Sequence, residues 1–114
     1  MARLTTHVLD TASGLPAAGL RVVLRRDREA KALAEALTNA EGRLDKPLLE
    51  GGACQPGGYE ISFHVGDYSR ARGTALAEPA FLDIVPVRFS IGADADYHLP
   101  LLISPYGYSV YRGS

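Results

Sequence analysis

Apolar and polar residues alternate along several short segments of the chain, and this alternation limits the possible folds more than any other feature. In residues 59–65 every second side chain is large and apolar, and residues 85–91 repeat the pattern. A period of two is typical of β-strands with one buried face. Three further segments, rich in Thr and Val or in Leu, also predict strands: residues 4–10, 20–26 and 98–103.

Turn-forming residues separate these segments. Glycine, proline, asparagine and aspartate gather at residues 10–14, 39–42, 51–52, 56–58 and 105–107. Short strands divided by such turns are typical of sandwiches, in which chain reversals are frequent. The sequence therefore predicts an all-β fold, a two-sheet β-sandwich of seven or eight strands with one short helix.

Three local features refine this prediction. Residues 33–37 lie in a stretch of high helix propensity, but they stand between strand-like segments, so we predict a strand. Residues 67–73 predict the short helix, with Asp67 as its N-cap and Gly73 near its end. Because proline lacks a backbone N–H, Pro86 predicts that its strand lies at a sheet edge or begins there.

Size and charge limit the function classes. The chain of 114 residues is expected to form a single domain, residues 1–114. Its net charge of −1 argues against nucleic acid as the main partner, since no basic excess is present to neutralise phosphates. No apolar run approaches the roughly 20 residues that span a bilayer, so no membrane partner is expected. Cys54 is the single cysteine, and the N-terminus leaves no room for a signal peptide, so we expect a cytoplasmic protein.

Three histidines are candidates for acid–base chemistry. His64 shares the polar face of its predicted strand with other polar residues, and a solvated face accounts for it. His7 and His98 also lie on predicted strands, and for them a structural and a functional role are both open. They are far apart in the sequence and form no metal-ligand motif, so no metal site is expected. The glycine pairs at 51–52 and 57–58 lack the helix and lysine of a phosphate loop.

Arg43 follows the turn at residues 39–42, which would present it at the start of a strand. A guanidinium binds a planar carbonyl or urea-like group through parallel hydrogen bonds, so Arg43 is a candidate for ligand binding. The alternative is an ordinary surface arginine beside a turn. The same two interpretations apply to Arg112.

The last four residues of the sequence follow an ordered element. Residues 101–110 predict a strand, a tight turn and a second strand. The tetrapeptide then offers the phenol of Tyr111, the guanidinium of Arg112, a glycine and the hydroxyl of Ser114. Chain ends are usually poorly ordered, but this one is suited to hold a small polar molecule.

Three segments together resemble one family. They read LTTHVLDTASGLPA at residues 4–17, TNAEGR at residues 38–43 and YHLPLLISPYGYSVYRGS at residues 97–114. Over nearly its whole length the chain is similar to the 5-hydroxyisourate hydrolases, the enzymes of the transthyretin family. Transthyretin itself, a carrier of thyroid hormone, has lysine, glutamate, threonine and threonine where this chain has His7, Arg43, His98 and Tyr111. The resemblance therefore favours an enzyme over a carrier.

The resemblance implies a fold, an assembly and a reaction. The implied fold is the transthyretin-like sandwich, which dimerises edge to edge. Two dimers form a homotetramer with active sites in a central channel at the dimer–dimer interface. The implied reaction opens the ring of 5-hydroxyisourate, a small-molecule substrate, by hydrolysing a lactam bond. It gives 2-oxo-4-hydroxy-4-carboxy-5-ureidoimidazoline in urate breakdown towards allantoin, a purine catabolic route, without cofactor or metal.

The resemblance also implies residue roles. His98, working with the hydroxyl of Ser114 or with the terminal carboxylate, is the expected general base. His7 orients or protonates the substrate, or shares the role of the base. Whether Ser114 attacks covalently or orients a water stays open, although the lack of an obvious triad favours water. The implied catalytic set is His7, Arg43, His98 and Ser114, and the implied substrate-binding set is His7, Arg43, Tyr111 and Arg112.

Two other function classes remain as alternatives. One is a non-catalytic carrier of small ligands that shares the fold of transthyretin. The other is a structural interaction module built on a β-sandwich, such as an adhesion or carbohydrate-binding domain. The single cysteine and the expected lack of a signal peptide count against extracellular adhesion.

Overall fold

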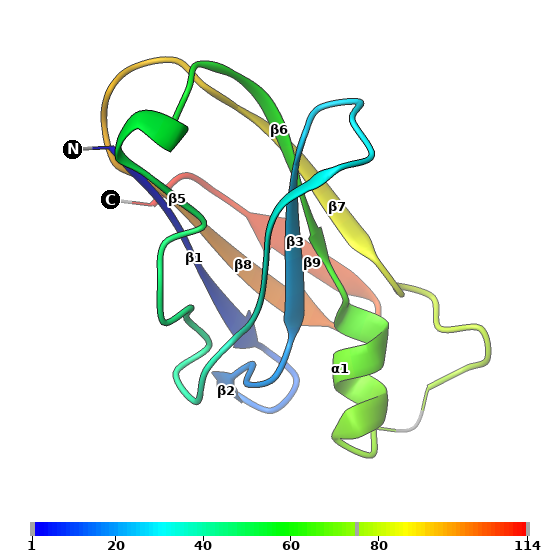
Figure 1. The fold of residues 1–114 in the computed structure, drawn as a ribbon. Helices are drawn as coiled ribbons and strands as arrows, with labels where there is room; N and C mark the ends of the chain where they lie inside the picture. Colours follow the sequence, from blue (N-terminus) through cyan, green and yellow to red (C-terminus); the bar gives the residue numbers. More distant parts are fainter. Residues whose placement is uncertain (1, 75, 114) are drawn as a thin grey trace.

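Two β-sheets stacked face to face form the molecule, and a short helix lies at one end of the stack (Figure 1). The computed structural model describes residues 2–74 and 76–113. We call the two sheets A and B. Sheet A contains β1 (Arg3–Asp10), β2 (Leu15–Pro16), β5 (Leu49–Glu50), β8 (Tyr97–Ser104) and β9 (Gly107–Val110). Sheet B contains β3 (Arg21–Arg26), β4 (Ala32–Leu37), β6 (Gly57–Phe63) and β7 (Val85–Ile91).

The helical elements are a single 3-10 turn, η1 (Gly51–Ala53), and the helix α1 (Val65–Ala71). Within the described residues, seven strands have four residues or more, and β2 and β5 have two residues each. The predicted all-β, two-sheet sandwich with one short helix is therefore confirmed. The two additional strands are short pairings along one edge of β1.

The pairing of β1 with β8 is the feature that positions the site. The strand order is β2-β1-β8-β9 in sheet A, with β5 also paired to β1, and β4-β3-β6-β7 in sheet B. β1 and β8 run parallel, whereas the other pairs are antiparallel. In this register Thr5 lies beside His98, and His7 lies beside Pro100. Two strands from opposite ends of the sequence thus present polar side chains on one surface.

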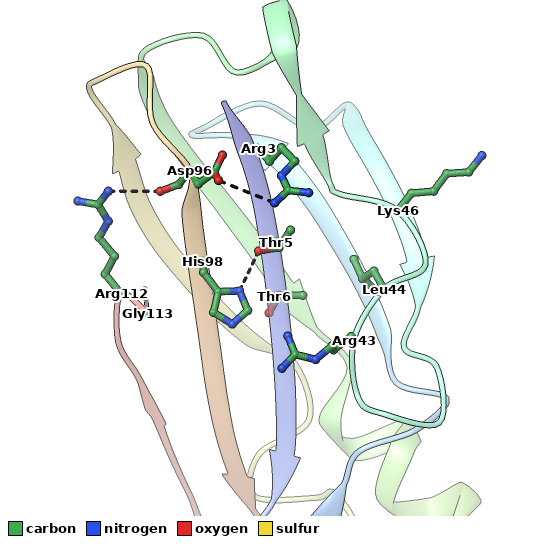
Figure 2. Close-up of a pocket in the computed structure, with 10 residues that line it drawn as sticks. All are labelled: Arg3, Thr5, Thr6, Arg43, Leu44, Lys46, Asp96, His98, Arg112 and Gly113. Carbon is green, nitrogen blue, oxygen red and sulfur yellow. Dashed lines mark hydrogen bonds and ion pairs between the residues drawn. The ribbon is translucent and has the colours of Figure 1, made fainter. Parts of the chain in front are cut away.

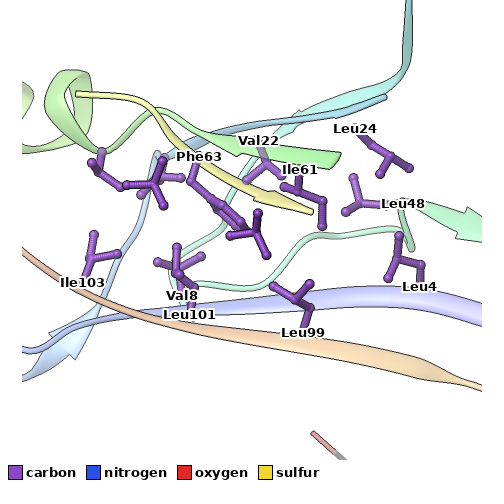
Figure 3. Packing of buried hydrophobic residues seen from close by; sticks show 14 of the residues in the cluster. Leu4, Val8, Val22, Leu24, Leu48, Ile61, Phe63, Leu99, Leu101 and Ile103 are labelled. Carbon is purple, nitrogen blue, oxygen red and sulfur yellow. The ribbon is translucent and has the colours of Figure 1, made fainter. Parts of the chain in front are cut away.

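The core lies between the sheets and leaves alternate residues of β1 and β8 on the outer surface of sheet A (Figure 3). Leu4 and Val8 of β1 and Leu99, Leu101 and Ile103 of β8 face inward. They belong to one apolar cluster with Val22, Leu24, Ile61 and Phe63 of sheet B. Full burial of such a side chain contributes about 1.5–3 kcal/mol to stability. The alternation places the intervening polar residues, the two histidines included, outside the core.

The two edge strands of sheet B, β7 and β4, correspond to two of the strands predicted from the sequence. β7 pairs only with β6 among the described strands and carries Pro86 as its second residue, so no ladder hydrogen bond is lost at an interior strand. The stretch of high helix propensity forms a strand, as predicted, and this strand, β4, is the other edge of the sheet. Pairing with β3 outweighs the local propensity there, since β4 follows β3 in antiparallel register.

The helix begins earlier than predicted. The sequence placed it over residues 67–73 with Asp67 as N-cap, but α1 covers Val65–Ala71 and His64 occupies the N-cap position. Val65 was predicted to end the preceding strand, yet it begins the helix, where its side chain is buried together with that of Tyr68. Burial of these two apolar groups against the core therefore outweighs the local capping preference of Asp67.

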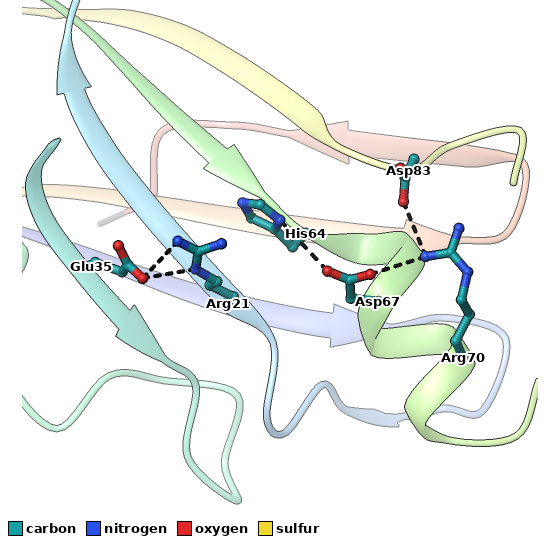
Figure 4. A network of polar contacts seen from close by, with 6 residues as sticks. All are labelled: Arg21, Glu35, His64, Asp67, Arg70 and Asp83. Atoms are coloured by element: carbon teal, nitrogen blue, oxygen red, sulfur yellow. Dashed lines mark hydrogen bonds and ion pairs between the residues drawn. The ribbon is translucent and has the colours of Figure 1, made fainter. Parts of the chain in front are cut away.

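The prediction of a solvated face for His64 was also wrong (Figure 4). The strand β6 ends at Phe63, and the side chain of His64 at the start of α1 is only 14% exposed. Its Nδ1 lies 3.9 Å from Oδ2 of Asp67, which also pairs with Arg70 at 3.0 Å. His64 is therefore a structural residue, covered by the junction between strand and helix.

A hydrogen bond of Tyr68 connects α1 to the end of β1, and we predict that it contributes measurably to the free energy of unfolding. Its hydroxyl donates to Oδ2 of Asp10 at 2.9 Å within the buried interior. Tyr68→Phe is expected to lower the free energy of unfolding by about 1–3 kcal/mol, because it leaves a buried carboxylate oxygen without this donor. Urea unfolding measures the loss. Tyr106→Phe is the control, since Tyr106 is 69% exposed, and an equal loss in both variants would contradict the assignment.

Candidate active site

His7, Arg43 and His98 meet on the outer surface of sheet A, although they come from three distant segments. His7 lies on β1, His98 on β8, and Arg43 in the loop beside β1. Together with Tyr111 and Gly113 they line a hollow of about 260 Å³, which we call the inner hollow. Its apolar walls include Leu9, Pro100 and Leu102. The structure therefore brings together four of the predicted site residues.

A second and larger depression adjoins the inner hollow (Figure 2). This outer recess of about 560 Å³ also contains Arg43, His98 and Gly113 among its lining residues. The charged side chains that line it are Arg3, Arg43, Lys46, Arg112 and Asp96. The lining therefore contains four cationic side chains and one carboxylate, although the whole chain has a net charge of −1. Such a local excess of positive charge attracts anions and the electron-rich oxygens of a polar ligand.

His98 is held in place, and its surroundings favour its uncharged form. Its Nδ1 and the hydroxyl of Thr5 share a hydrogen bond of 2.8 Å. Burial lowers the pKa of His98 below its ordinary value, and the nearby charges of Arg43 and His7 lower it further. A neutral imidazole at neutral pH can accept a proton, so His98 fits the role of a general base.

The hydrogen bond of His7 defines its tautomer. Its Nε2 lies 2.9 Å from the backbone carbonyl oxygen of Glu41. A carbonyl oxygen only accepts, so Nε2 carries a hydrogen and donates it. In the neutral ring Nδ1 is then free to accept a hydrogen bond, and in the charged ring it is a second donor. The two histidines therefore differ in the nitrogen that is available to a ligand.

The turn before Arg43 is built as the sequence indicated, but no strand begins there. Oδ1 of Asn39 accepts hydrogen bonds from the backbone N–H groups of Glu41 and Arg43, at 2.9 and 3.1 Å. Gly42 has a φ of +75°, and a Cβ at this position would overlap the carbonyl oxygen of Val8. Arg43 then forms an isolated bridge with His7 rather than a strand. The predicted strand is wrong because the loop touches the edge of β1 at single points.

The site residues predicted in the tail do not all line the same hollow. Tyr111 is 57% exposed and lines the inner hollow. Arg112 lines the outer recess, but its guanidinium stacks on Tyr97 with Cζ 4.3 Å from the ring centroid. It also donates to the backbone carbonyl of Asp96 at 3.4 Å. Ser114, the remaining predicted catalytic residue, lies outside the described residues.

Sequence reasoning missed the residue that orients His98. Thr5 lies two residues before His7 on the same strand face, a position visible in the sequence, but nothing local connects it with His98. The outer recess adds Arg3 and Lys46, which no motif singled out. These residues acquire a common surface only through the parallel pairing of β1 and β8 and the loop that follows Arg43.

The described residues show neither a metal-binding cluster nor a membrane-spanning helix. Among residues 2–74 and 76–113, no three His, Cys, Asp or Glu side chains gather as they would around a metal ion. In the same part of the chain, no helix combines the length and apolar character needed to cross a membrane. The candidate site rests on the inner hollow, which brings His7, Arg43 and His98 together.

Comparison with known proteins gives consistent matches. The model of the HIUase/Transthyretin family matches residues 4–113. A protein of Mesorhizobium japonicum named 5-hydroxyisourate hydrolase is 59% identical over 114 residues, which cover 98% of this chain and 92% of the relative. The structure of Klebsiella pneumoniae 5-hydroxyisourate hydrolase has a TM-score of 0.84 at 35% identity and covers 100% of both chains.

A crystal structure of (S)-allantoin synthase is also similar, with a TM-score of 0.93 at 44% identity. The alignment covers 99% of this chain but only 44% of the synthase chain. All of these similarities extend over nearly the whole of this sequence, as does the match of the family model. The chain therefore belongs to the HIUase/Transthyretin family.

Proposed function

We propose that this protein is a hydrolase that opens the lactam ring of 5-hydroxyisourate. The product is 2-oxo-4-hydroxy-4-carboxy-5-ureidoimidazoline, in urate breakdown towards allantoin. The observation that carries the proposal is the convergence of His7, Arg43 and His98 on one hollow. Full-length relatives that bear the name 5-hydroxyisourate hydrolase support the same substrate.

The reaction adds one water across an amide bond. The water oxygen bonds to the carbonyl carbon, the carbon–nitrogen bond breaks, and the leaving nitrogen takes up a proton. Such chemistry needs a base for the water, a partner for the developing oxyanion and a proton donor for the nitrogen. The inner hollow offers one side chain for each need.

His98 is the proposed general base. When its Nδ1–H donates to the hydroxyl of Thr5, the lone pair of Nε2 is free to take a proton from water. The lowered pKa of His98, caused first by burial and then by Arg43 and His7, keeps this lone pair available at neutral pH. The hydrogen bond to Thr5 orients the ring, and the proposal requires the tautomer in which Nδ1 donates and the hydroxyl of Thr5 accepts.

Arg43 and His7 complete the proposed set. The guanidinium of Arg43 binds carbonyl oxygens of the planar substrate and offsets the negative charge that develops during attack. His7, anchored through Nε2 to Glu41, presents Nδ1 to the leaving nitrogen, to which it gives a proton when charged. Tyr111 contributes a wall of the hollow, and substrate contacts of Arg112 and a role of Ser114 as water-orienting group stay predictions.

We also propose that four copies assemble, with the sites at the dimer–dimer interface. The inner hollow lies on the outer surface of sheet A, and Tyr111 beside it is exposed, so a second copy facing sheet A would enclose the substrate. Analytical ultracentrifugation should give four times the 12.2 kDa chain mass, and a monomer would contradict the assembly.

Two coarser expectations accompany this proposal. One continuous apolar cluster joins both sheets, which supports residues 1–114 as a single domain. A site of action in the cytoplasm is supported by the single cysteine, which excludes an intrachain disulfide.

The alternative is a carrier of small ligands without catalysis. The apolar walls of the inner hollow, formed by Leu9, Pro100 and Leu102, favour this alternative, because apolar walls can bind a ring-shaped ligand without any catalysis. Binding alone, however, does not require that His98 have a lowered pKa and be oriented by Thr5, whereas general-base catalysis does. Product analysis separates the two functions.

The test of the proposed function is identification of the product formed from freshly generated 5-hydroxyisourate. Mass spectrometry should detect a compound heavier than the substrate by one water. In water labelled with heavy oxygen, the label should enter the new carboxylate. Formation of this product at no more than the spontaneous rate, with binding of the substrate, would favour the carrier.

We predict that kcat/KM falls as the pH decreases through the pKa of His98. Because the shift lowers this pKa, the midpoint of the fall should lie below the ordinary value of about 6.5. On this limb of the profile, activity should rise with the neutral fraction of the His98 ring and be lost below the midpoint. A pH–rate profile measures this, and in His7→Asn the midpoint should move upward, because a positive neighbour is removed. A wild-type midpoint above the ordinary value would exclude His98 as the titrating base.

A further inference from the structure

The residues that follow β9 continue along β8 beside His98. The backbone N–H of Tyr111 donates to the carbonyl of Pro100 at 3.4 Å, and that of Gly113 donates to the carbonyl of His98 at 2.8 Å. Gly113 forms an isolated bridge with His98. The first bond is long and weak and the second is of ordinary length, so the backbone bonds alone hold this segment at essentially one point.

Gly113 is required at its position by contact and not by backbone conformation. Its φ lies outside the left-handed region, so an alanine would fit the backbone. A Cβ there, however, would lie 2.8 Å from Cδ2 of His98 and 3.0 Å from Cγ of Pro100. The tail backbone therefore rests against the imidazole, whose Nδ1 is held by Thr5. Any side chain at 113 must displace either the ring or the tail.

Arg112 supplies a second attachment for the tail. Its guanidinium stacks on Tyr97, the residue before His98, and reaches the carbonyl of Asp96. Tyr97 is fixed in turn, because its hydroxyl accepts hydrogen bonds from the backbone N–H groups of Gly92 and Ala93, each at 3.1 Å. Figure 2 shows the Arg112 side chain directed toward Asp96 and away from Arg43. A stacked guanidinium of this kind is an attractive contact that lysine or glutamine reproduces poorly.

We infer that Arg112 and Gly113 are positioning residues for His98. Arg112, stacked on Tyr97, holds the tail on β8, and Gly113 lets the tail backbone lie against the imidazole. The ring is thereby confined between Thr5 and the tail, with Nε2 left to the substrate. This inference rests on the proposed function in one respect, namely that His98 is the base. It gives Arg112 a task that needs no contact with the substrate.

Gly113→Ala tests the contact with the ring. We expect kcat to fall about 10-fold to 100-fold with little change in KM, since small misplacement of a reacting group costs up to this much. Histidine-ring NMR should report a change in the tautomer or pKa of His98. Gly52→Ala is the matched control, because a Cβ at Gly52 meets no atom within 4 Å and its φ is not left-handed. Circular dichroism checks that both variants fold.

Arg112→Gln and Tyr97→Leu test the stack from its two sides. Each should lower kcat about 10-fold and shift the His98 NMR signals, and the double variant should be no worse than either single one. Tyr97→Phe, which keeps the ring, should retain more activity than Tyr97→Leu. Arg26→Gln is the matched control, since Arg26 stacks on Tyr59 with Cζ 4.7 Å from the ring centroid and donates to the carbonyl of Pro56 at 3.3 Å.

The outcomes separate this inference from its rivals. If Arg112 binds substrate directly, Arg112→Gln raises KM and leaves the His98 NMR signals unchanged. Tyr97→Leu then does not raise KM. That result would overturn the positioning role, as would an unchanged kcat and unchanged His98 signals in Gly113→Ala. If the wild-type protein is inactive while Gly113→Ala still shifts the His98 signals, the proposed function fails and the contact with the ring stands.

Discussion

His98→Ala is expected to lower kcat/KM for 5-hydroxyisourate about 100-fold or more, the usual contribution of a general base. The loss should appear mainly in kcat, because His98 acts on water and the walls of the inner hollow remain. The hydrogen bond between Nδ1 and Thr5 and the lowered pKa both prepare this ring to accept a proton. Steady-state rates on freshly generated substrate, corrected for spontaneous ring opening, measure the effect.

His64→Ala is the matched control for this prediction. His64 is also a histidine next to a strand, but its side chain is mostly covered at the start of α1 and lies near Asp67. Its removal should leave kcat/KM close to that of the wild type, with any effect confined to stability. Near-normal turnover in His98→Ala, or equal losses in the two variants, would remove His98 from the mechanism.

Arg43→Glu, which introduces the residue of transthyretin, is expected to reduce kcat/KM about 100-fold, as loss of an oxyanion partner typically does. The carboxylate repels the carbonyl oxygens that the guanidinium would bind, so KM should rise as well. The pKa of His98 should also increase, because the positive charge that helps to lower it is replaced by a negative one. The pH–rate profile of the variant should therefore fall at a higher pH than that of the wild type.

Arg43→Lys separates charge from geometry in this prediction. Lysine keeps the positive charge near His98, so the midpoint of the pH–rate profile should stay near the wild-type value. It lacks the two parallel donors of a guanidinium, so substrate binding should still weaken. If KM and kcat were unchanged in Arg43→Glu, Arg43 would lie outside the site.

Much of the fold follows from local patterns, and its exceptions have physical causes. The period of two places strands correctly where one face is buried, and Pro86 marks an edge because it lacks a backbone donor. The start of α1 was predicted two residues late, since the capping signal of Asp67 is local whereas the burial of Val65 depends on the opposite sheet. The prediction of a solvated face for His64 was wrong for a related reason, because β6 ends at Phe63 and the junction with α1 covers the His64 side chain.

The site is harder to predict from local patterns than the fold. Thr5 and His98 are 93 positions apart, and their contact depends on the parallel pairing of β1 and β8, which no turn or spacing encodes. The family resemblance identified His7, Arg43 and His98 as a set, but it assigned no task to Thr5 and did not reveal the stack of Arg112 on Tyr97. Such contacts require the folded arrangement.

The most direct measurement is the rate of loss of the ultraviolet absorbance of 5-hydroxyisourate with the wild-type protein and with one triple variant. The variant carries the transthyretin residues His7→Lys, Arg43→Glu and His98→Thr together. The wild-type protein should accelerate ring opening far above the spontaneous rate, and the triple variant should return it to that rate while remaining folded. A wild-type rate equal to the spontaneous one, or a triple variant as active as the wild type, would contradict catalysis at this site.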